Sequence, residues 1–381
     1  MRKGWQTKPF EDCIESVKYT RKIQRKDFLD DGEFPIVSQE AEFTNGYWDD
    51  EADVFKVSTP VVIFGDHTQV LKYVDFDFVL GADGVKILPP RDFLHPKFFF
   101  YQLQASNLTS LGYARHYRLL KELEIKYPPL PEQHRIVAIL DEAFAGIATA
   151  KANAEKNLQN ARAIFESHLQ SVFTQRGEGW AEKRLGDLSR INYGYTESAS
   201  AEQVGPHFLR ITDIQDNEVD WDTVPYCPID KSDFPKYKLV DGDIVFARTG
   251  ATTGKSYLVT KPPESVFASY LIRVQLSDKE LLPQFVNLFF QTHSYWDTIR
   301  AGVSGSAQGG FNATKLGELV IPFPKSSKEQ VSIVAKLDKL TAETQHLARI
   351  YEGKLDALEA LKKSLLNQAF TGELKPKGNP K

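Results

Sequence analysis

The chain has 381 residues, of which 41% are hydrophobic and 26% are charged, a composition typical of a globular protein with two or three domains. No apolar run approaches the roughly 20 residues that a membrane span needs, and residues 1–12 lack a secretory signal pattern, so we expect a cytoplasmic protein with no membrane partner. Cys13 and Cys227 lie far apart with no histidine at metal-ligand spacing, which argues against disulfides and a zinc site.

The net charge of −4 opposes nucleic-acid binding, because phosphate contacts depend on lysine and arginine. Charge can nevertheless be segregated along a chain. Residues 16–26 contain five basic residues and no acidic one. This local basic segment supplies the first candidate DNA contacts, Lys18, Arg21 and Lys22.

Residues 1–130 are expected to form a domain of mixed α and β structure. Strand-like runs cover residues 60–64 and 85–88, and a short helix is expected at residues 96–105. A polar segment follows the first of these strands. A second polar segment, residues 112–121, contains four basic or histidine side chains and no acidic residue. Candidate DNA contacts in the two segments are His67, Thr68, Gln69 and Lys72, then Tyr113, Arg115, His116 and Arg118. A histidine between strands is often only structural, so the alternative of a structural His67 stays open.

Residues 131–176 are predicted to form a long helix. Pro128 and Pro129 prevent a helix immediately before it, and Gly177 lies where a helix would end. A helix of about 42 residues is roughly 63 Å long at 1.5 Å per residue. Apolar residues recur by heptads, as in a coiled-coil seam. The two stripes, interrupted by Lys151, are Val137, Phe144, Leu158, Phe165 and Val172 with Leu140, Ile147, Ala154 and Ala161.

Residues 177–325 are expected to form a second mixed domain, with strands at residues 243–247 and 271–276 and a helix at residues 283–293. The segment 250–256 (GATTGKS) resembles a phosphate-binding loop, but it has one residue too few between its glycines and precedes a strand-like run instead of a helix. A loop that contacts DNA fits it better, and its candidate contacts are Arg248, Thr249, Thr252, Thr253 and Lys255. A hairpin in which Arg248 pairs with Asp243 remains the structural alternative.

The segment 302–315 (GVSGSAQGGFNATK) has no acidic residue and is rich in glycine, serine and amide side chains. Glutamine and asparagine can form paired hydrogen bonds with adenine. A solvated loop is the alternative to DNA contact here. The candidate contacts are Ser304, Ser306, Gln308, Asn312 and Lys315.

Residues 326–373 are predicted to form a second long helix, followed by a tail at residues 374–381. Leu337, Thr344, Tyr351, Leu358 and Leu365 stand seven residues apart, and we expect Val334, Leu340, Leu347, Leu355 and Leu361 to accompany them in the seam, which Lys362 interrupts.

The same order of segments occurs twice. Residues 5–14 (WQTKPFEDCI) match residues 180–189 (WAEKRLGDLS), and the two long-helix segments match at a constant offset of 197, as between Gln133 and Gln330. An insertion in paired helices would rotate everything beyond it by about 100° per residue, which explains the constant offset. The repeat predicts an α+β protein with two mixed α/β domains separated by two long antiparallel helices that form a coiled coil, with an internal pseudo-twofold relation.

The chain resembles the specificity (S) subunits of Type I restriction-modification enzymes over its full length. The segments that carry the resemblance are 128–133 (PPLPEQ), which runs into the first long helix, and 368–374 (QAFTGEL), with 242–245 (GDIV) and 63–68 (IFGDHT) in the globular parts. The segment 322–330 (PFPKSSKEQ) departs from the tighter proline run of the first copy. That departure leaves the entry into the second helix open.

The resemblance implies a non-catalytic subunit whose two target-recognition domains each read one half of an asymmetric, interrupted DNA site. It further implies that the helices act as spacers and bind two methyltransferase (M) subunits, through which restriction (R) subunits join. S-adenosylmethionine is then expected in the methyltransferase subunits, ATP and Mg in the restriction subunits, and no cofactor or metal in this chain.

Two other functions remain to be tested. The first is a stand-alone nucleotide-using or DNA-modifying enzyme, which the loop at residues 250–256 alone supports. The chain lacks the Asn/Asp-Pro-Pro-aromatic tetrapeptide of amino-methyltransferases. The second is a coiled-coil scaffold that does not bind DNA, which the salt dependence of DNA binding would distinguish.

Overall fold

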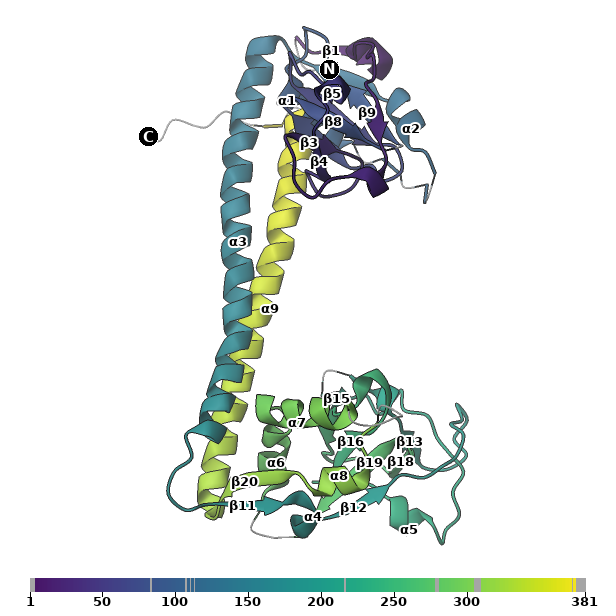
Figure 1. The fold of residues 1–381 in the computed structure, drawn as a ribbon, viewed down its shortest axis with the longest axis vertical. Coiled ribbons are helices and arrows are strands. Elements are labelled where there is room, and N and C mark those ends of the chain that lie inside the picture. The colour runs from purple at the N-terminus through teal and green to yellow at the C-terminus, as the bar shows by residue number, and fades with distance from the viewer. Residues whose placement is uncertain are drawn as a thin grey trace. The chain divides into compact units, whose positions relative to one another are not determined.

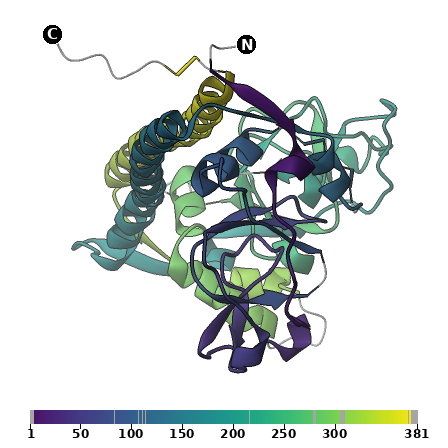
Figure 2. The same cartoon turned by 90° about the horizontal axis from the view of Figure 1, so that it is seen from above.

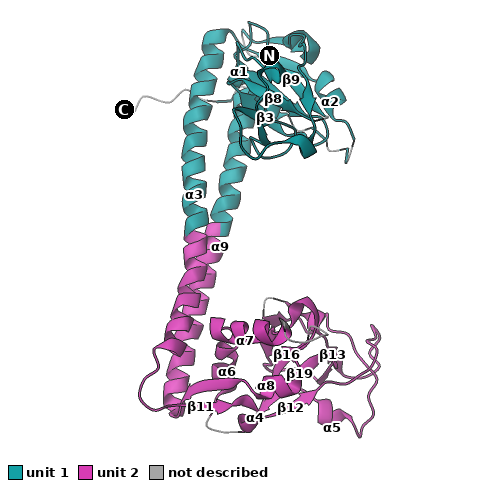
Figure 3. Cartoon of the chain, viewed as in Figure 1, with its two compact units in different colours: residues 1–156, 352–381 teal, residues 157–351 magenta. Residues whose placement is uncertain are grey.

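The structure is a computed structural model that describes residues 4–82, 84–106, 108–109, 111–112, 114–215, 217–277, 281–304, 310–371 and 373–374 (Figure 1). The chain divides into two compact units (Figure 3). Unit 1 is Met1–Lys156 with Glu352–Lys381, and unit 2 is Asn157–Tyr351. Each unit therefore contains one globular part and a portion of both long helices. Within the described residues, no helix combines the length and apolar character that crossing a bilayer requires.

The described residues of unit 1 form three small sheets and, besides the long helices and short 3-10 turns, two short α-helices. The helices are α1 (Pro96–Ala105) and α2 (Tyr117–Lys121). The sheets have the strand orders β1-β10, β2-β8-β3-β4 with β5 on β8, and β7-β6-β9. The strands are β1 (Gln6–Pro9), β2 (Lys22–Ile23), β3 (Phe34–Val37), β4 (Gly46–Trp48), β5 (Val54–Phe55), β6 (Val61–Gly65), β7 (Leu71–Val74), β8 (Phe78–Gly81), β9 (Val85–Leu88) and β10 (Glu124–Tyr127).

Unit 2 has a similar plan with additional short elements. Its sheets have the orders β11-β20, β12-β19-β16-β17, β13-β18 and β14-β15. The strands are β11 (Trp180–Arg184), β12 (Ser189–Tyr193), β13 (His207–Leu209), β14 (Ile214–Gln215), β15 (Glu218–Val219), β16 (Ile244–Ala247), β17 (Ser256–Leu258), β18 (Ser265–Phe267), β19 (Leu271–Leu276) and β20 (Val320–Pro324). The short helices are α4 (Leu185–Leu188), α5 (Phe234–Tyr237), α6 (Pro283–Phe289), α7 (His293–Ser304) and α8 (Ala313–Gly317).

The repeat inferred from the sequence recurs in the strand pairing of the two units. In each unit the first strand pairs antiparallel with the last strand before a long helix, β1 with β10 and β11 with β20. Each unit also has a central strand, β6 or β16, flanked by two antiparallel neighbours. One side of each central strand packs toward the long helices: Val62 and Phe64 do so in unit 1, and Ile244 and Phe246 in unit 2.

The long helices α3 (Leu130–Thr174) and α9 (Ser327–Thr371) run side by side (Figures 1 and 2). In unit 1, Leu140 near the start of α3 shares a core with Ala369 near the end of α9. Farther along α3, Lys151 forms an ion pair of 2.9 Å with Glu359, which precedes Ala369. The partner position in α9 thus moves backwards as α3 moves forwards, so the helices are antiparallel, as predicted.

The seam of α9 differs from the predicted one. Leu347 and Leu361 are exposed, whereas Thr341, Ala348 and Lys362 are partly buried. In this part of the helix the second stripe therefore follows the first by four residues instead of three, and the prediction for Leu347 and Leu361 was wrong, whereas Leu340 is partly buried. Residues three and four positions apart both lie on the same face of an α-helix. A leucine-rich stripe on either side of the seam therefore satisfies the heptad pattern, and the pattern alone does not choose between them.

A buried glutamine joins the start of each long helix to its own globular part. Gln133 and Gln330 are both 0% exposed. The Gln133 amide accepts from His95 N at 2.8 Å and donates to Phe93 O and Pro128 O, each at 2.8 Å. The Gln330 amide accepts from Leu282 N at 2.9 Å and donates to Pro324 O at 2.8 Å. These amides satisfy backbone groups next to prolines and so fix the entry into each helix.

The predicted helix at residues 283–293 is interrupted in the structure. The α6 helix ends at Phe289 and α7 begins at His293. The Thr292 hydroxyl donates to Phe289 O at 2.7 Å and accepts from Tyr295 N at 3.3 Å. A threonine side chain that bonds to the backbone on both sides ends one helix and starts the next.

Candidate nucleic-acid interface

Two polar segments of unit 1, residues 65–72 and 111–118, are brought together in what we call the first loop site. Asp66 O accepts from His116 N at 2.7 Å, and the Asp66 carboxylate accepts from Tyr117 N at 2.7 Å. The His116 ring accepts from Leu111 N at 3.0 Å and contacts Asp66 O at 3.0 Å. Segments that are about 50 residues apart in the sequence therefore form one surface.

The charged side chains at the rim of the first loop site are exposed. Arg115 and Arg118 are exposed, and Lys86 on β9 has its ammonium 5.1 Å from the Tyr117 ring centre. Lys86 is partly exposed, and basic side chains on this loop and on the strand beside Tyr117 favour phosphate contact.

Two predicted contacts of the first loop site were wrong, because the side chains of Lys72 and His116 are buried. Lys72 is 4% exposed, and its ammonium donates to Glu42 O, to Phe43 O at 3.3 Å and to Asn45 Oδ1 at 3.2 Å. Burial lowers the pKa of Lys72 below its ordinary value. His116 is 1% exposed. Both side chains hold neighbouring backbone in place and present no polar atom for DNA, because each polar atom is already bonded within the protein.

The turn after β6 contains the remaining predicted residues of this segment. The Thr68 hydroxyl donates to Gln39 O at 2.6 Å, and Gln69 has a positive φ of 59°. His67 N donates to the Gln39 side chain at 3.3 Å. The side chains of His67 and Gln69 are partly exposed and Thr68 is exposed. Hydrogen bonds to Gln39 thus hold this turn in place, while its side chains remain at least partly accessible.

The basic segment near the N-terminus is accessible as well. Lys18 is exposed, and Arg21, with a side chain 68% exposed, lies 3.6 Å from Asp53. Lys22 on β2 has its ammonium 5.2 Å from the Tyr19 ring centre, and the Tyr19 hydroxyl accepts from Ile87 N on β9 at 3.2 Å. Lys22 therefore lies near the strand that carries Lys86.

In unit 2, residues 248–255 and 310–315 form a corresponding second loop site. Phe311 N donates to Arg248 O at 2.9 Å, and Ala313 N donates to the Tyr193 hydroxyl at 3.1 Å. The Arg248 guanidinium lies 4.9 Å from the Tyr193 ring centre, and its Nε is buried with no partner among the described residues. As in unit 1, the loop after the central strand meets the loop before a short helix.

The segment 250–256 is a hairpin loop between β16 and β17. Ala247 N donates to Lys255 O at 2.8 Å, and Gly254 N donates to Ala247 O at 2.9 Å. A Cβ on Gly254 would lie 2.8 Å from Trp296 and Ile299 of α7, so this glycine, at φ +97°, permits close packing. No helix follows the loop, so it lacks the helix N-terminus that a phosphate-binding loop requires.

The structural alternative for this segment holds only in part: the hairpin is present, but Arg248 does not pair with Asp243. Asp243, 2% exposed, lies 3.7 Å from Arg273 and accepts from Val240 N and from Gln275. Burial raises the pKa of Asp243, while these contacts oppose that rise. Arg248 is consequently available to the second loop site.

The other predicted residues of unit 2 fall into two groups. Thr249 and Thr252 are partly exposed and Lys255 is exposed. Thr253 is 9% exposed and donates to Gly250 O at 2.8 Å, so it stabilises the loop. Lys315 donates to Gly302 O at 2.8 Å, and Asn312 accepts from Lys315 N at 2.9 Å as the N-cap of α8. Tyr113, Ser306, Gln308 and the Ser304 side chain lie outside the described residues.

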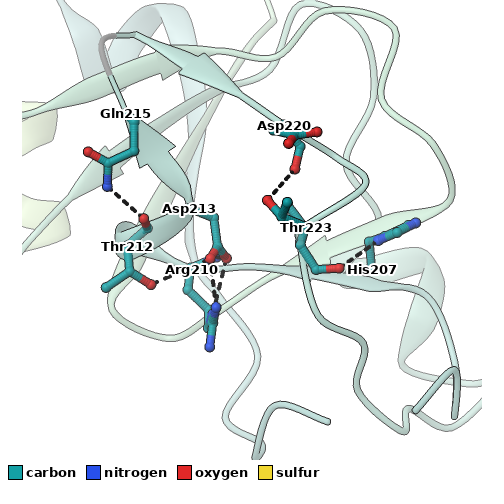
Figure 4. A network of polar contacts seen from close by, with 8 residues as sticks. His207, Arg210, Thr212, Asp213, Gln215, Asp220 and Thr223 are labelled. Atoms are coloured by element: carbon teal, nitrogen blue, oxygen red, sulfur yellow. Dashed lines mark hydrogen bonds and ion pairs between the residues drawn. The ribbon is translucent and has the colours of Figure 1, made fainter. Parts of the chain in front are cut away.

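A groove of about 340 Å³ borders the second loop site through Tyr270. Tyr270 is 61% exposed, and Tyr270 O accepts from Arg248 N at 3.2 Å. The far wall carries Arg210 and Thr212, which belong to the polar network in Figure 4. There the Arg210 guanidinium donates to both carboxylate oxygens of Asp213, and Gln215 donates to Thr212 O at 2.8 Å. This paired arginine is held in one orientation at the groove.

Sequence reasoning missed Lys86, Tyr193, Arg210 and Tyr270. Lys86 alternates with buried residues along β9, a pattern that marks an outward position but no function. Tyr193 is the last residue of β12 and Tyr270 directly precedes β19, positions that many core tyrosines occupy. Their role depends on Gly194, where a Cβ would lie 2.2 Å from Ala268 O and prevent the close approach of the two chain segments. In the described part of the chain, no group of three or more His, Cys, Asp and Glu residues is arranged to hold a metal ion.

Comparison with known proteins places this arrangement in a class. The profile of the family described as "Type I restriction modification DNA specificity domain" matches residues 2–159 and 177–353. Each match covers one globular part with most of the helix that follows it. The chain belongs to this family, and the resemblance inferred from its sequence is confirmed.

The similar proteins agree with that assignment. The chain is 24% identical to the Type I restriction enzyme EcoKI specificity subunit of Escherichia coli K12, over 97% of this chain and 89% of that protein. It is 23% identical to the Type I restriction enzyme EcoBI specificity subunit of Escherichia coli, over 84% of this chain and 78% of that protein. At this level of identity the family is shared while individual contact residues need not be.

Solved structures support the fold. A chain described under complex assembly and conformational transition of the type I R-M system has a TM-score of 0.75 at 19% identity, covering 98% of this chain and 99% of that chain. The HsdS subunit from Thermoanaerobacter tengcongensis has a TM-score of 0.57 at 18% identity, with 98% of each chain covered. The predicted fold of two mixed domains and two long helices is thus confirmed.

Proposed function

We propose that this chain is the DNA-recognition subunit of a Type I restriction-modification system and that each unit reads one half of an asymmetric, interrupted DNA site. The observation that carries the proposal is the recurrence of a paired-loop site on one scaffold. Both units place the loop after a central strand against the loop before a short helix, and both belong to the matched regions. The loops differ in their side chains, so two different half-sites are expected.

Accessible arginines and lysines would supply phosphate and base contacts at each site. Arg115, Arg118 and Lys86 serve the first loop site, while Arg248, Lys255 and the groove arginine Arg210 serve the second. These local clusters offset the net charge of −4, because a phosphate responds to charges within about 10 Å at 0.1 M salt. Lys18, Arg21, Lys22, His67, Thr68, Gln69, Thr249, Thr252 and Asn312 remain proposed contacts.

The partner subunits are part of this proposal. Two methyltransferase subunits would bind the long helices and carry S-adenosylmethionine, and restriction subunits that use ATP and Mg would join through them. The chain itself would then be non-catalytic and cytoplasmic, with residues 131–176 and 326–373 acting as spacers between recognition domains at 1–130 and 177–325.

A domain exchange tests the proposal. Residues 177–325 are replaced by the corresponding domain of another family member, and methylated positions are sequenced in DNA from cells that carry the complete system. We expect one half of the methylated sequence to change while the other half is retained. A change in both halves would contradict independent reading, and the absence of salt-dependent DNA binding by the unaltered complex would favour a scaffold.

A further inference from the structure

Unit 2 contains an open cavity of about 550 Å³ between its short helix α6 and the two long helices. Gln284, Asn287 and Leu288 of α6 and Leu258 of β17 line one side. Phe165 of α3 with Asp338 and Thr341 of α9 line the other. A volume of this size is within the range of small-molecule sites.

The equivalent place in unit 1 is filled by a chain of side-chain contacts. Asp141 of α3 accepts from the Lys97 ammonium at 2.9 Å and from the Tyr101 hydroxyl at 2.5 Å, both on α1. The Tyr101 and Phe144 rings lie 5.3 Å apart at an angle of 83°, and the Lys362 ammonium lies 5.5 Å from the Phe144 ring centre. These contacts join α1 to both long helices.

The repeat offsets identify the counterparts of these residues in unit 2. At an offset of 187, Lys97 corresponds to Gln284, Phe100 to Asn287 and Tyr101 to Leu288. At an offset of 197, Asp141 corresponds to Asp338, Phe144 to Thr341, and Phe165 to Lys362. Every position that fills the space in unit 1 thus lines the cavity in unit 2. The carboxylate is retained, whereas its ammonium, its hydroxyl and the facing ring are absent.

One polar group of the cavity wall lacks the partner that its position calls for, and a second is an exposed carboxylate. The exposed Asp338 makes no side-chain hydrogen bond or ion pair with any residue that the structure describes, so its charge is open to a ligand. Asn287 is 8% exposed, and its Oδ1 is buried with no partner among the described residues. A buried acceptor without a partner is costly, so a hydrogen-bond donor is expected there.

The charges of the wall favour a cation. The ionisable residues that line the cavity are Arg162, Glu166, Glu218 and Asp338, three acids and one base. Phe165, Leu258 and Leu288 provide apolar surface beside them. A ligand that combines an ammonium group with an aromatic body matches both, since ring faces and aliphatic side chains accept the body while carboxylates bind the ammonium.

We propose that this cavity binds a small arylalkylamine, with its ammonium on Asp338 and its ring against Phe165 and Leu288. The ligand would supply in unit 2 the groups that Lys97 and Tyr101 supply in unit 1. The bound ligand would then join α6 to α9, as side-chain contacts join α1 to α3. Because the ligand binds only the folded chain, it would stabilise unit 2. This inference is independent of the proposed DNA recognition.

Calorimetric titration of the full-length chain with tyramine tests the proposal. We expect saturable binding of one molecule per chain and a rise in the melting temperature. The uncharged analogue 4-ethylphenol should bind much more weakly. The Asp338→Asn variant should bind tyramine about tenfold to a hundredfold more weakly, since an ionic hydrogen bond is lost. Glu343→Gln, an exposed carboxylate on the same helix outside this cavity, is the matched control and should bind normally.

A second variant fills the cavity with the residues of unit 1. The triple change Gln284→Lys, Leu288→Tyr and Thr341→Phe should abolish tyramine binding and raise the melting temperature without ligand. No saturable binding of tyramine at millimolar concentration to the folded unaltered chain would overturn the proposal and indicate a water-filled space. Equal binding of 4-ethylphenol, or full binding by Asp338→Asn, would equally overturn it. DNA binding, measured separately, reports on the other proposal.

Discussion

Units 1 and 2 share a scaffold but hold their loop sites with different groups. In unit 1 the buried side chains of His116 and Lys72 form hydrogen bonds with neighbouring loop segments, so their polar atoms are not available to DNA. In unit 2 the loops meet through backbone bonds to Arg248 and through the Tyr193 hydroxyl, which leaves the guanidinium beside an exposed ring. Basic or polar character alone therefore does not identify a contact residue, because the same character serves to fix a loop.

The groups that the units have in common lie at the entry of the long helices, and changing them should have the largest effect. Gln330→Ala and Gln133→Ala each remove a buried amide and leave backbone groups without partners. We expect the free energy of unfolding to fall by about 2–4 kcal/mol in each case. Chemical denaturation of the chain measures this loss.

Gln159→Ala on the exposed face of α3 is the matched control and should change stability by less than about 0.5 kcal/mol. A strong effect of only one of the two buried glutamines would break the comparison, because it would mean that the units do not depend equally on this contact.

Arginine substitutions at the two loop sites should separate the half-sites. Arg248→Ala should weaken binding to the half-site read by unit 2 by about 1–3 kcal/mol, and Arg115→Ala should affect the other half-site. Fluorescence anisotropy at fixed salt, with duplexes altered in one half at a time, measures both. Arg184→Ala, an exposed arginine of β11, is the control. If Arg248→Ala weakened recognition of both halves equally, the two loop sites would not act separately.

Each unit contains one buried cysteine, whose thiol reports on local unfolding of that unit. Cys13 in unit 1 and Cys227 in unit 2 are both 0% exposed, and burial raises the pKa of each thiol from 9.0 to about 11. Above pH 9 the unfolded thiol loses its proton first, so stability is fully present below pH 9 and falls as pH rises toward 11. We expect a loss of roughly 1 kcal/mol per thiol between pH 8 and pH 10.

Thiol labelling with single Cys→Ala variants at pH 8 assigns that loss to a unit. Slow labelling of both cysteines is expected, since the folded thiols are protonated and covered. Fast labelling of one of them would show that its unit opens more readily and would make the comparison quantitative.

The sequence by itself determined the repeat, the long helices and the mixed character of the domains. Helix periodicity and proline positions are local properties, so they placed α3 and α9 within two residues of their observed ends. The rejection of a phosphate-binding loop at residues 250–256 rested on the same kind of local rule and agrees with the hairpin found there. The convergence of residues 66 and 116 needed long-range strand pairing, which no local pattern contains.

Only the tertiary structure decided which polar residues are accessible and which face of α9 forms the seam. Lys72 and His116 look like surface residues in a sequence, but neighbouring carbonyl groups surround them after folding. Leu347 and Leu361 satisfy a heptad rule, yet α3 contacts the adjacent stripe. Burial and hydrogen bonding depend on segments far apart in the chain, whereas periodicity depends on neighbours, and this is why the elements were predictable and the contacts were not.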